Sequence, residues 1–280
     1  CWPGAARATV AGLMGAAINA GILLLSQLAR HWPITPDSWR WIFRLAAAPA
    51  VLGLLVILFL PESPRWKASQ GAGQRAAAPV RELLRPPLLR RTLVGILLGS
   101  IPLVGAWAAS KWMIPWADKV GDVVRPGYKA QTQGWWALGA IFGSFAGAQV
   151  ARWLGRRVSY ALISVGAAVL TVAMFRFTAP LEPSFLPVVF AQGFVGTLFF
   201  GWLPLYLPEL FPLRVRATGS GIAYNVGRFA TAAGVMGAGM LFTALGGSYP
   251  AVGALGALVY AAGLAAVWLA PDTRDTDLDR

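Results

Sequence analysis

The side chains of this sequence that are best suited to chemistry stand together in one apolar stretch. Arg228 follows Tyr224 by four residues and Asn225 by three, so a helix would bring all three to nearly the same face. A guanidinium binds a carboxylate through two parallel hydrogen bonds, and the phenol and the amide would fix the orientation of that ligand. The group predicts a binding site for a small organic anion, with a structural ion pair between Arg228 and an acidic residue elsewhere as the alternative.

The composition places this group in a membrane protein. Hydrophobic residues make up 57% of the chain, charged residues only 12%, and the mean hydropathy is +0.60, whereas soluble domains carry about 25% charged residues. The net charge of +13 does not indicate a nucleic-acid partner, because the basic residues stand in short loops between apolar stretches. Cys1 is the only cysteine, so no disulfide can form within the chain.

Eight apolar stretches are long enough to cross a membrane as helices, which takes roughly 20 residues each. They are residues 10–28, 41–60, 92–114, 131–150, 158–177, 185–205, 217–241 and 250–270. If the loops alternate sides, one side holds clearly more Lys and Arg than the other. Arg30 and Lys111 are counted on the side with fewer. The richer side is the cytoplasm. We therefore expect a multi-pass protein of the inner or plasma membrane with both chain ends in the cytoplasm.

Arg228 is predicted to lie near the middle of the membrane. It comes 12 residues after Arg216, which is about 18 Å along a helix, and the apolar core is about 30 Å thick. A charge at that depth is costly unless it faces a water-filled cavity or a counter-charge. Gln192 and Asn19 are expected to line the same cavity. Tryptophans either form its walls or anchor helices at the membrane interface; they are Trp107, Trp135, Trp136 and Trp202.

Acidic residues are absent from the interior of all eight stretches. An enzyme would need a nucleophile, an acid–base pair or a metal cluster, and the only histidine, His31, stands in an outer loop. We therefore expect no enzyme, no cofactor and no metal site. If transport is coupled to protons, the titrating carboxylate must belong to helices that precede this chain. A sensor or scaffold that does not transport is the remaining alternative.

A long repeat predicts the size of the fold. Segments 2–12 and 211–221 share an aromatic residue before proline, an Arg-Ala-Thr triplet and a glycine at equal spacing. Six apolar stretches separate them, an even number, so both lie on the cytoplasmic side. The repeat unit is then six helices. We expect an all-α membrane protein with eight of twelve transmembrane helices in this chain and four more preceding it.

Three motifs resemble the major facilitator superfamily, in its branch of sugar porters and metabolite:proton symporters. They are PESPRW at 61–66, GAQVARWLGRR at 147–157 and PELFPLRVRATGSG at 208–221. The resemblance implies two bundles that rock between inward-open and outward-open states and move a small solute. Sugar porters of the family carry a glutamine pair in the seventh helix, which stretch 92–114 lacks. An organic acid is therefore favoured over a sugar, with a facilitator or efflux protein of the same family as further alternatives.

Charged residues of the cytoplasmic loops are predicted to latch one of these states. The candidates are Glu62, Arg65, Arg152, Arg156, Glu209 and Arg216. Glu209 would pair with Arg216 or with an arginine of another loop. Glu62 would pair with Arg65 or Arg152. Exposed ion pairs contribute little, so charges that only determine topology are an equal alternative.

The division of the chain follows from these stretches. We expect the end of a first bundle, a basic cytoplasmic loop that joins the halves, a complete six-helix bundle and a cytoplasmic tail, at residues 1–60, 61–91, 92–270 and 271–280. Glycines at 139, 143 and 147 share one helix face and predict a close approach of two helices. The expected partners are a small-molecule substrate, the lipid bilayer and protons as coupling ion, with no nucleic acid and a monomer at full length.

Overall fold

The computed structural model describes residues 4–32, 34–61, 79–271 and 273, with the backbone alone at residues 4–8 and 79. The described residues form helices and connecting turns, without a strand. The α-helices are α1 (Gly4–His31), α2 (Arg40–Ala47), α3 (Pro49–Phe59), α5 (Pro79–Leu83), α6 (Leu88–Val104), α7 (Met113–Ala117), α8 (Tyr128–Leu154), α9 (Arg156–Arg176), α10 (Phe185–Glu209), α11 (Arg216–Ala244), α12 (Tyr249–Gly256) and α13 (Leu258–Ala266). The predicted all-α fold is confirmed for this part of the chain.

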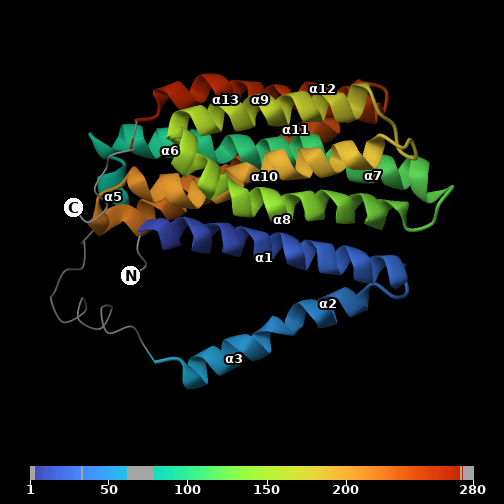
Figure 1. The fold of residues 1–280 in the computed structure, drawn as a ribbon, viewed down its shortest axis with the longest axis horizontal. Helices are drawn as coiled ribbons and strands as arrows, with labels where there is room; N and C mark the ends of the chain where they lie inside the picture. The colour runs from blue at the N-terminus through green and yellow to red at the C-terminus, as the bar shows by residue number, and fades with distance from the viewer. Residues whose placement is uncertain (1–3, 33, 62–78, 272, 274–280) are drawn as a thin grey trace.

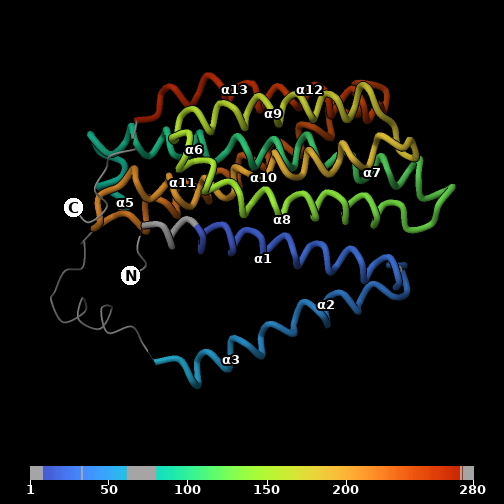
Figure 2. The backbone as a smooth tube through the Cα atoms, in the orientation of Figure 1, coloured from blue at the N-terminus to red at the C-terminus, as the bar shows by residue number. Residues whose placement is uncertain are grey.

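The helices from α6 to α13 lie side by side in one bundle with nearly parallel axes (Figure 1). Helix α1 lies along one side of this bundle, where it packs against α8 and α10. The segment formed by α2 and α3 runs away from α1 and from the bundle (Figure 2). None of its residues is buried, although it is strongly apolar.

Six helical segments of the described chain are long and apolar enough to cross a membrane. They are Thr9–His31, Arg40–Phe59, Leu88–Asp122, Arg156–Arg176, Phe185–Glu209 and Tyr249–Leu269. Helices α8 and α11 are longer than most of these, with 27 and 29 residues, but their glycines and polar residues make them less apolar. Each of the eight predicted stretches therefore falls on a helical segment. That all eight segments cross the membrane, and that the complete protein has twelve such helices, stay predictions.

The third predicted stretch, residues 92–114, is part of a longer helical run, so its predicted end is wrong. The run extends over 35 residues from Leu88 to Asp122. Its middle is irregular: α6 is followed by a π-helical turn at Gly105–Ala109 and a 3₁₀ turn at Ser110–Trp112 before α7 begins. Lys111, which lies within the predicted stretch and is counted with the charges of the outer side, is inside this run.

Pro102 accounts for a missing hydrogen bond in the same run. Proline has no backbone N–H, so the carbonyl four residues earlier loses its helical donor. That carbonyl belongs to Leu98, and it accepts a hydrogen bond from the Tyr160 hydroxyl of α9 at 2.9 Å. A neighbouring helix thus supplies the bond that the proline removes, which is how membrane helices tolerate proline.

Glycines set the distance between α8 and α10. A Cβ atom at Gly139, Gly143 or Gly147 would lie 2.1, 2.0 or 2.1 Å from a backbone carbonyl oxygen of α10. On the facing helix, a Cβ atom at Gly193 or Gly201 would come within 2.3 or 2.4 Å of a carbonyl oxygen of α8. These separations are far below van der Waals contact, so only glycine fits. The close approach predicted from the glycine spacing is confirmed.

Candidate functional site

Two members of the predicted group on α11, Tyr224 and Arg228, lie against each other. The guanidinium carbon of Arg228 lies 5.3 Å from the centre of the Tyr224 ring, a distance at which a cation is attracted to an aromatic face. Arg228 and Asn225 are both exposed, and the Asn225 side chain donates to the Gly221 carbonyl of its own helix at 2.8 Å. Among the described residues no carboxylate pairs with Arg228. The guanidinium is therefore open to an anionic ligand.

Packing of α11 against α6 fixes the level of this group. The Cβ position of Gly227 lies 3.2 Å from the Ser100 backbone, and that of Gly234 lies 2.9 Å from a Val104 methyl group. The two helices are thus in close contact on one side of α11, and Arg228 projects from another side. Arg228 comes 16 residues before the end of α11 at Ala244, which is about 24 Å along the helix.

Three other predicted binding residues do not join this group. The Asn19 amide donates to Ser144 Oγ of α8 at 2.9 Å, the buried Trp202 indole donates to the Arg156 carbonyl at 3.0 Å, and Gln192 is buried among other polar side chains. Each of these side chains contacts a neighbouring helix. Their part in a cavity with Arg228 stays a prediction.

Gln192 is the centre of a buried polar network that the sequence did not reveal. Its amide oxygen accepts from the Trp136 indole at 2.8 Å, and its amide nitrogen donates to Ser110 Oγ at 2.5 Å. Ser110 Oγ also lies 3.2 Å from Thr171 Oγ1 and 3.0 Å from the Tyr260 hydroxyl. The network joins the Leu88–Asp122 run, α8, α9, α10 and α13.

Lys111 lies beside this network. Its Nζ atom is 3.2 Å from the centre of the Trp136 ring and donates to Gln133 Oε1 at 3.1 Å. No acidic side chain of the described chain forms a salt bridge with it. Lys111 falls within the predicted stretch 92–114, and a lysine inside an apolar stretch is the signal that could have identified it.

Where α9 begins and α10 ends, Glu209 pairs with an arginine of another loop, Arg156. The pair is bidentate, at 3.0 Å from Nε and 2.6 Å from Nη2, and the two side chains are only 12% and 4% exposed. Arg156 also donates to the Ala151 carbonyl at 2.9 Å, and Thr273 donates to Glu209 at 2.5 Å. This is a buried, bidentate pair and not an exposed loop contact.

The other latch candidates make different contacts. Arg216 donates to the Phe211 carbonyl at 3.2 Å, and Arg152 donates to Gln149 Oε1 at 3.2 Å. Glu62 and Arg65 lie outside the described residues. The latch role of all six residues stays a prediction.

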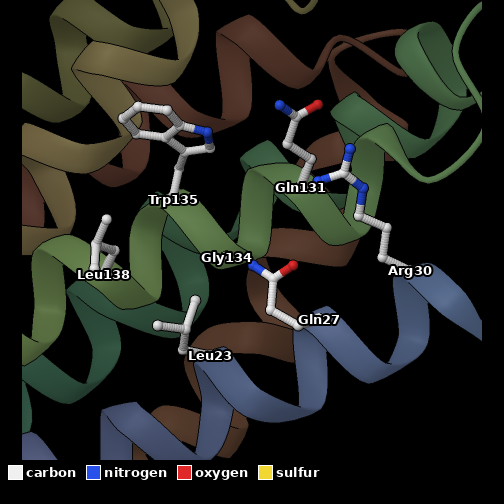
Figure 3. Close-up of a pocket in the computed structure, with 7 residues that line it drawn as sticks. All are labelled: Leu23, Gln27, Arg30, Gln131, Gly134, Trp135 and Leu138. Atoms are coloured by element: carbon white, nitrogen blue, oxygen red, sulfur yellow. The ribbon is translucent and has the colours of Figure 1, made fainter.

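A cavity of about 200 Å³ opens between α1 and α8, away from the predicted site. Its lining residues are Leu23, Gln27, Arg30, Gln131, Gly134, Trp135 and Leu138. Figure 3 shows Arg30 reaching from α1 toward Gln131 of α8, with Trp135 rising from the same helix. One cation, two amides and an indole could together receive a small planar anion.

Long apolar helices with basic loops, glycine-packed interfaces and charged side chains among the helices define a multi-pass membrane protein. A family model, the Major Facilitator Superfamily, matches residues 1–235. The chain belongs to this family. The relatives that match this chain are named as transport proteins and not as enzymes.

Curated relatives agree with this assignment. The chain is 29% identical over 251 residues to the cis,cis-muconate transport protein of Acinetobacter baylyi, and the alignment covers 86% of this chain and 59% of that protein. It is 29% identical over 255 residues to a probable 4-methylmuconolactone transporter of Cupriavidus pinatubonensis, covering 90% and 58%. It is 30% identical over 220 residues to the inner membrane metabolite transport protein YhjE of Escherichia coli, covering 74% and 48%. The chain spans less than two-thirds of the length of these relatives.

Proposed function

We propose that this chain is part of a twelve-helix secondary transporter that carries small organic acids by alternating access. Residues 1–60 would be the end of a first bundle, residues 61–91 the cytoplasmic loop between the halves, residues 92–270 the complete second bundle and residues 271–280 a tail. The bare apolar surface of α2 and α3 supports this division, because such a surface needs further helices or lipid against it. The relatives, which are longer than this chain, support it as well.

The substrate class is proposed from a single observation, the surroundings of Arg228. It is exposed on α11, sits over the Tyr224 ring and faces no carboxylate of the described chain. A cation among membrane helices needs a water-filled cavity or an anion, and a substrate carboxylate would supply that anion. Two relatives are named for muconate and a muconolactone, which supports a carboxylate as the ligand. In this proposal Tyr224 and Asn225 orient the substrate.

The buried pair of Arg156 and Glu209 supports the cytoplasmic part of the proposal. It ties the start of α9 to the end of α10, so these two helices would move as one body when the halves rock. Both ends of the chain and the basic loops would face the cytoplasm of an inner or plasma membrane, with protons as the coupling ion and the monomer as the working unit.

The test is uptake of labelled cis,cis-muconate by cells that produce the protein from its complete reading frame and otherwise lack this activity. Replacing Arg228→Ala removes a charge-assisted hydrogen-bond donor, which is worth a loss of about 10- to 100-fold in kcat/KM. Arg228→Lys should retain part of the activity, because the charge stays and the bidentate geometry is lost. Uptake is measured with and without an acidic exterior, and stimulation by acid identifies protons as the coupling ion.

The matched control is Arg176→Ala. Arg176 is an exposed arginine in the last turn of α9, so its loss should leave uptake unchanged. If Arg228→Ala behaves like Arg176→Ala, the site on α11 is wrong. If the unmodified protein takes up no carboxylate from a panel of organic acids, the substrate class is wrong.

A further inference from the structure

We propose that Lys111 is a second binding group for a carboxylate of the transported solute, nearer the outer end of the helices than Arg228. This inference rests on the proposed transport of organic acids. It adds a residue that the motifs do not include and assigns it a ligand of stated chemistry, a carboxylate.

The position of Lys111 is the first argument. It lies 11 residues before the end of its helical run at Asp122, which is about 16 Å along a helix. Its neighbour Trp136 lies eight residues after the start of α8 at Tyr128, about 12 Å from that end. Both estimates place the ammonium group about two to three turns inside the ends of these helices, within a run apolar enough to cross a membrane. A lysine at that depth is costly, faces the bundle interior or a wet cavity, and marks a functional pathway by default.

The contacts of Lys111 are the second argument. An ammonium group has three donors. One donates to Gln133 Oε1 at 3.1 Å, and the charge lies 3.2 Å from the centre of the Trp136 ring. The described chain places no carboxylate in a salt bridge with it, and the side chain is only partly buried. Donors therefore stay available for a ligand that brings negative charge.

The surroundings hold this group in place. The Trp136 indole donates to Gln192, and Gln192 donates to Ser110, the residue before Lys111. The ring beneath the cation and the backbone that carries it are thus fixed by the same amide. Binding sites need this kind of support from residues that do not touch the ligand. Gln192 is then a positioning residue, which explains why it is buried and not exposed to a cavity.

The irregular helix is an independent sign of function. Lys111 stands where a π-helical turn gives way to a 3₁₀ turn, and Ala109 at that junction has φ −124° and ψ −77°. Such interruptions of an α-helix frequently occur at functional sites. Here the interruption rotates Lys111 relative to α6 and directs it at α8.

Arg228 and Lys111 lie at two different depths along the helices, so the substrate would meet them one after the other. Contacts of Gly227 place Arg228 at the level of Ser100 along α6, and Lys111 follows Ser100 by 11 residues, about 16 Å along the run. This separation is longer than a small dicarboxylate, so the two groups would hold a substrate in turn and not together. Lys111 would receive the carboxylate on the outer side, and Arg228 would hold it deeper in the membrane.

The experiment uses the complete protein in cells and measures KM and the maximal rate of muconate uptake. Lys111→Met should raise KM about 10- to 100-fold, the value of one charge-assisted hydrogen bond. Lys111→Arg, which keeps the charge, should stay close to the unmodified protein. The matched control is Lys119→Met, an exposed lysine of the same run, which should leave KM unchanged.

A chemical rescue separates charge from side-chain shape. Cys1 is the only cysteine of this chain, so Lys111→Cys can be made with every other cysteine changed to serine. Its thiolate attacks aminoethyl methanethiosulfonate, releases methanesulfinate and forms a disulfide that carries an ammonium group. This modification should restore a low KM, whereas methyl methanethiosulfonate, which adds no charge, should not. Muconate should slow the modification in proportion to its occupancy of the site.

The outcomes distinguish the two proposals. If Lys111→Met reaches the membrane with unchanged KM, or if muconate does not protect Cys at this position, Lys111 has a structural role only and this inference fails. A structural role would lower the amount of inserted protein or the maximal rate, and not KM. If the unmodified protein transports no carboxylate, the proposed function fails and this inference fails with it. If Lys111→Met does not fold, the cysteine variant and Lys111→Arg decide the question.

Discussion

Adding one methyl group at Gly143 should force α8 and α10 apart. The new Cβ atom would lie 2.0 Å from the Phe194 carbonyl oxygen and 2.5 Å from Thr197 Oγ1. Ordinary van der Waals contact begins at 3.4 Å, so 3.4 minus 2.0 leaves about 1.4 Å that one helix must move. Backbone atoms on the facing helix cannot turn aside as a flexible side chain could.

The cost is that of overpacking, which at a tight interface is typically about 1–3 kcal/mol. Thr197 Oγ1 lies 3.1 Å from the Ala140 carbonyl across the interface, but its hydroxyl proton also has the Gly193 carbonyl of its own helix at 2.7 Å, so the shift need not break a hydrogen bond. We expect Gly143→Ala to lower the free energy of unfolding by about 1–3 kcal/mol.

The measurement is the stability of the purified protein in detergent, by thermal or denaturant unfolding. Gly237→Ala on α11 is the matched control, because a Cβ atom there meets nothing within 4 Å. Alanine favours a helix over glycine by about 0.5–1 kcal/mol, so the control should be neutral or slightly more stable. Equal stability of Gly143→Ala and Gly237→Ala would refute the close contact of α8 with α10.

Two further predictions concern charge pairs at opposite ends of the bundle. Removing one partner of the buried pair, in Arg156→Met, should destabilise the protein by about 3–5 kcal/mol because Glu209 is left as an uncompensated charge. Exchanging both residues, Arg156→Glu with Glu209→Arg, should recover part of that loss in a double-mutant cycle, and full additivity of the two single changes would argue against the pair. In contrast, Asp118→Asn breaks the exposed pair with Lys129 and should change the same unfolding measurement by less than about 1 kcal/mol; a larger loss would mean that this pair is shielded from water.

Patterns of apolar residues were sufficient to predict the helices. Each of the eight predicted stretches falls on a helical segment, and the glycine spacing on one of them predicted the face at which another helix approaches closely. Both signals are local, because helix periodicity and small-residue spacing belong to one segment at a time. The ends of helices were less certain. The third stretch continues to Asp122 because polar residues can extend a helix beyond its apolar part.

The direction in which a side chain points was not predictable in the same way. Gln192 and Trp202 were assigned to a substrate cavity because they are polar or aromatic residues in apolar stretches. The structure turns Gln192 toward Trp136 and Ser110, and Trp202 toward the Arg156 carbonyl. Sequence identifies that a polar group needs a partner in the membrane, but only the packing of several helices determines whether the partner is a substrate or a neighbour.

The surroundings of a charged residue, Lys111, were equally hard to predict from the sequence. Loop lysines determine orientation in the membrane, so a lysine near the end of an apolar stretch is naturally counted as a loop residue. The irregular turns between α6 and α7 keep the helical run going past it. Those turns have no simple sequence signature, and they decide whether the residue faces water or the bundle interior.

The donors of Arg156 also narrow the search for a latch between the two halves. Its guanidinium makes two bonds to Glu209 and one to the Ala151 carbonyl, and all of these partners lie in the region 92–270. In the proposed mechanism, a bond satisfied within one bundle would persist while the halves rock, so it would not by itself distinguish the inward-open from the outward-open state. A latch needs a charge that gains a partner in only one state. Arg152, which is exposed and contacts Gln149 of its own helix, meets that requirement better than Arg156 does.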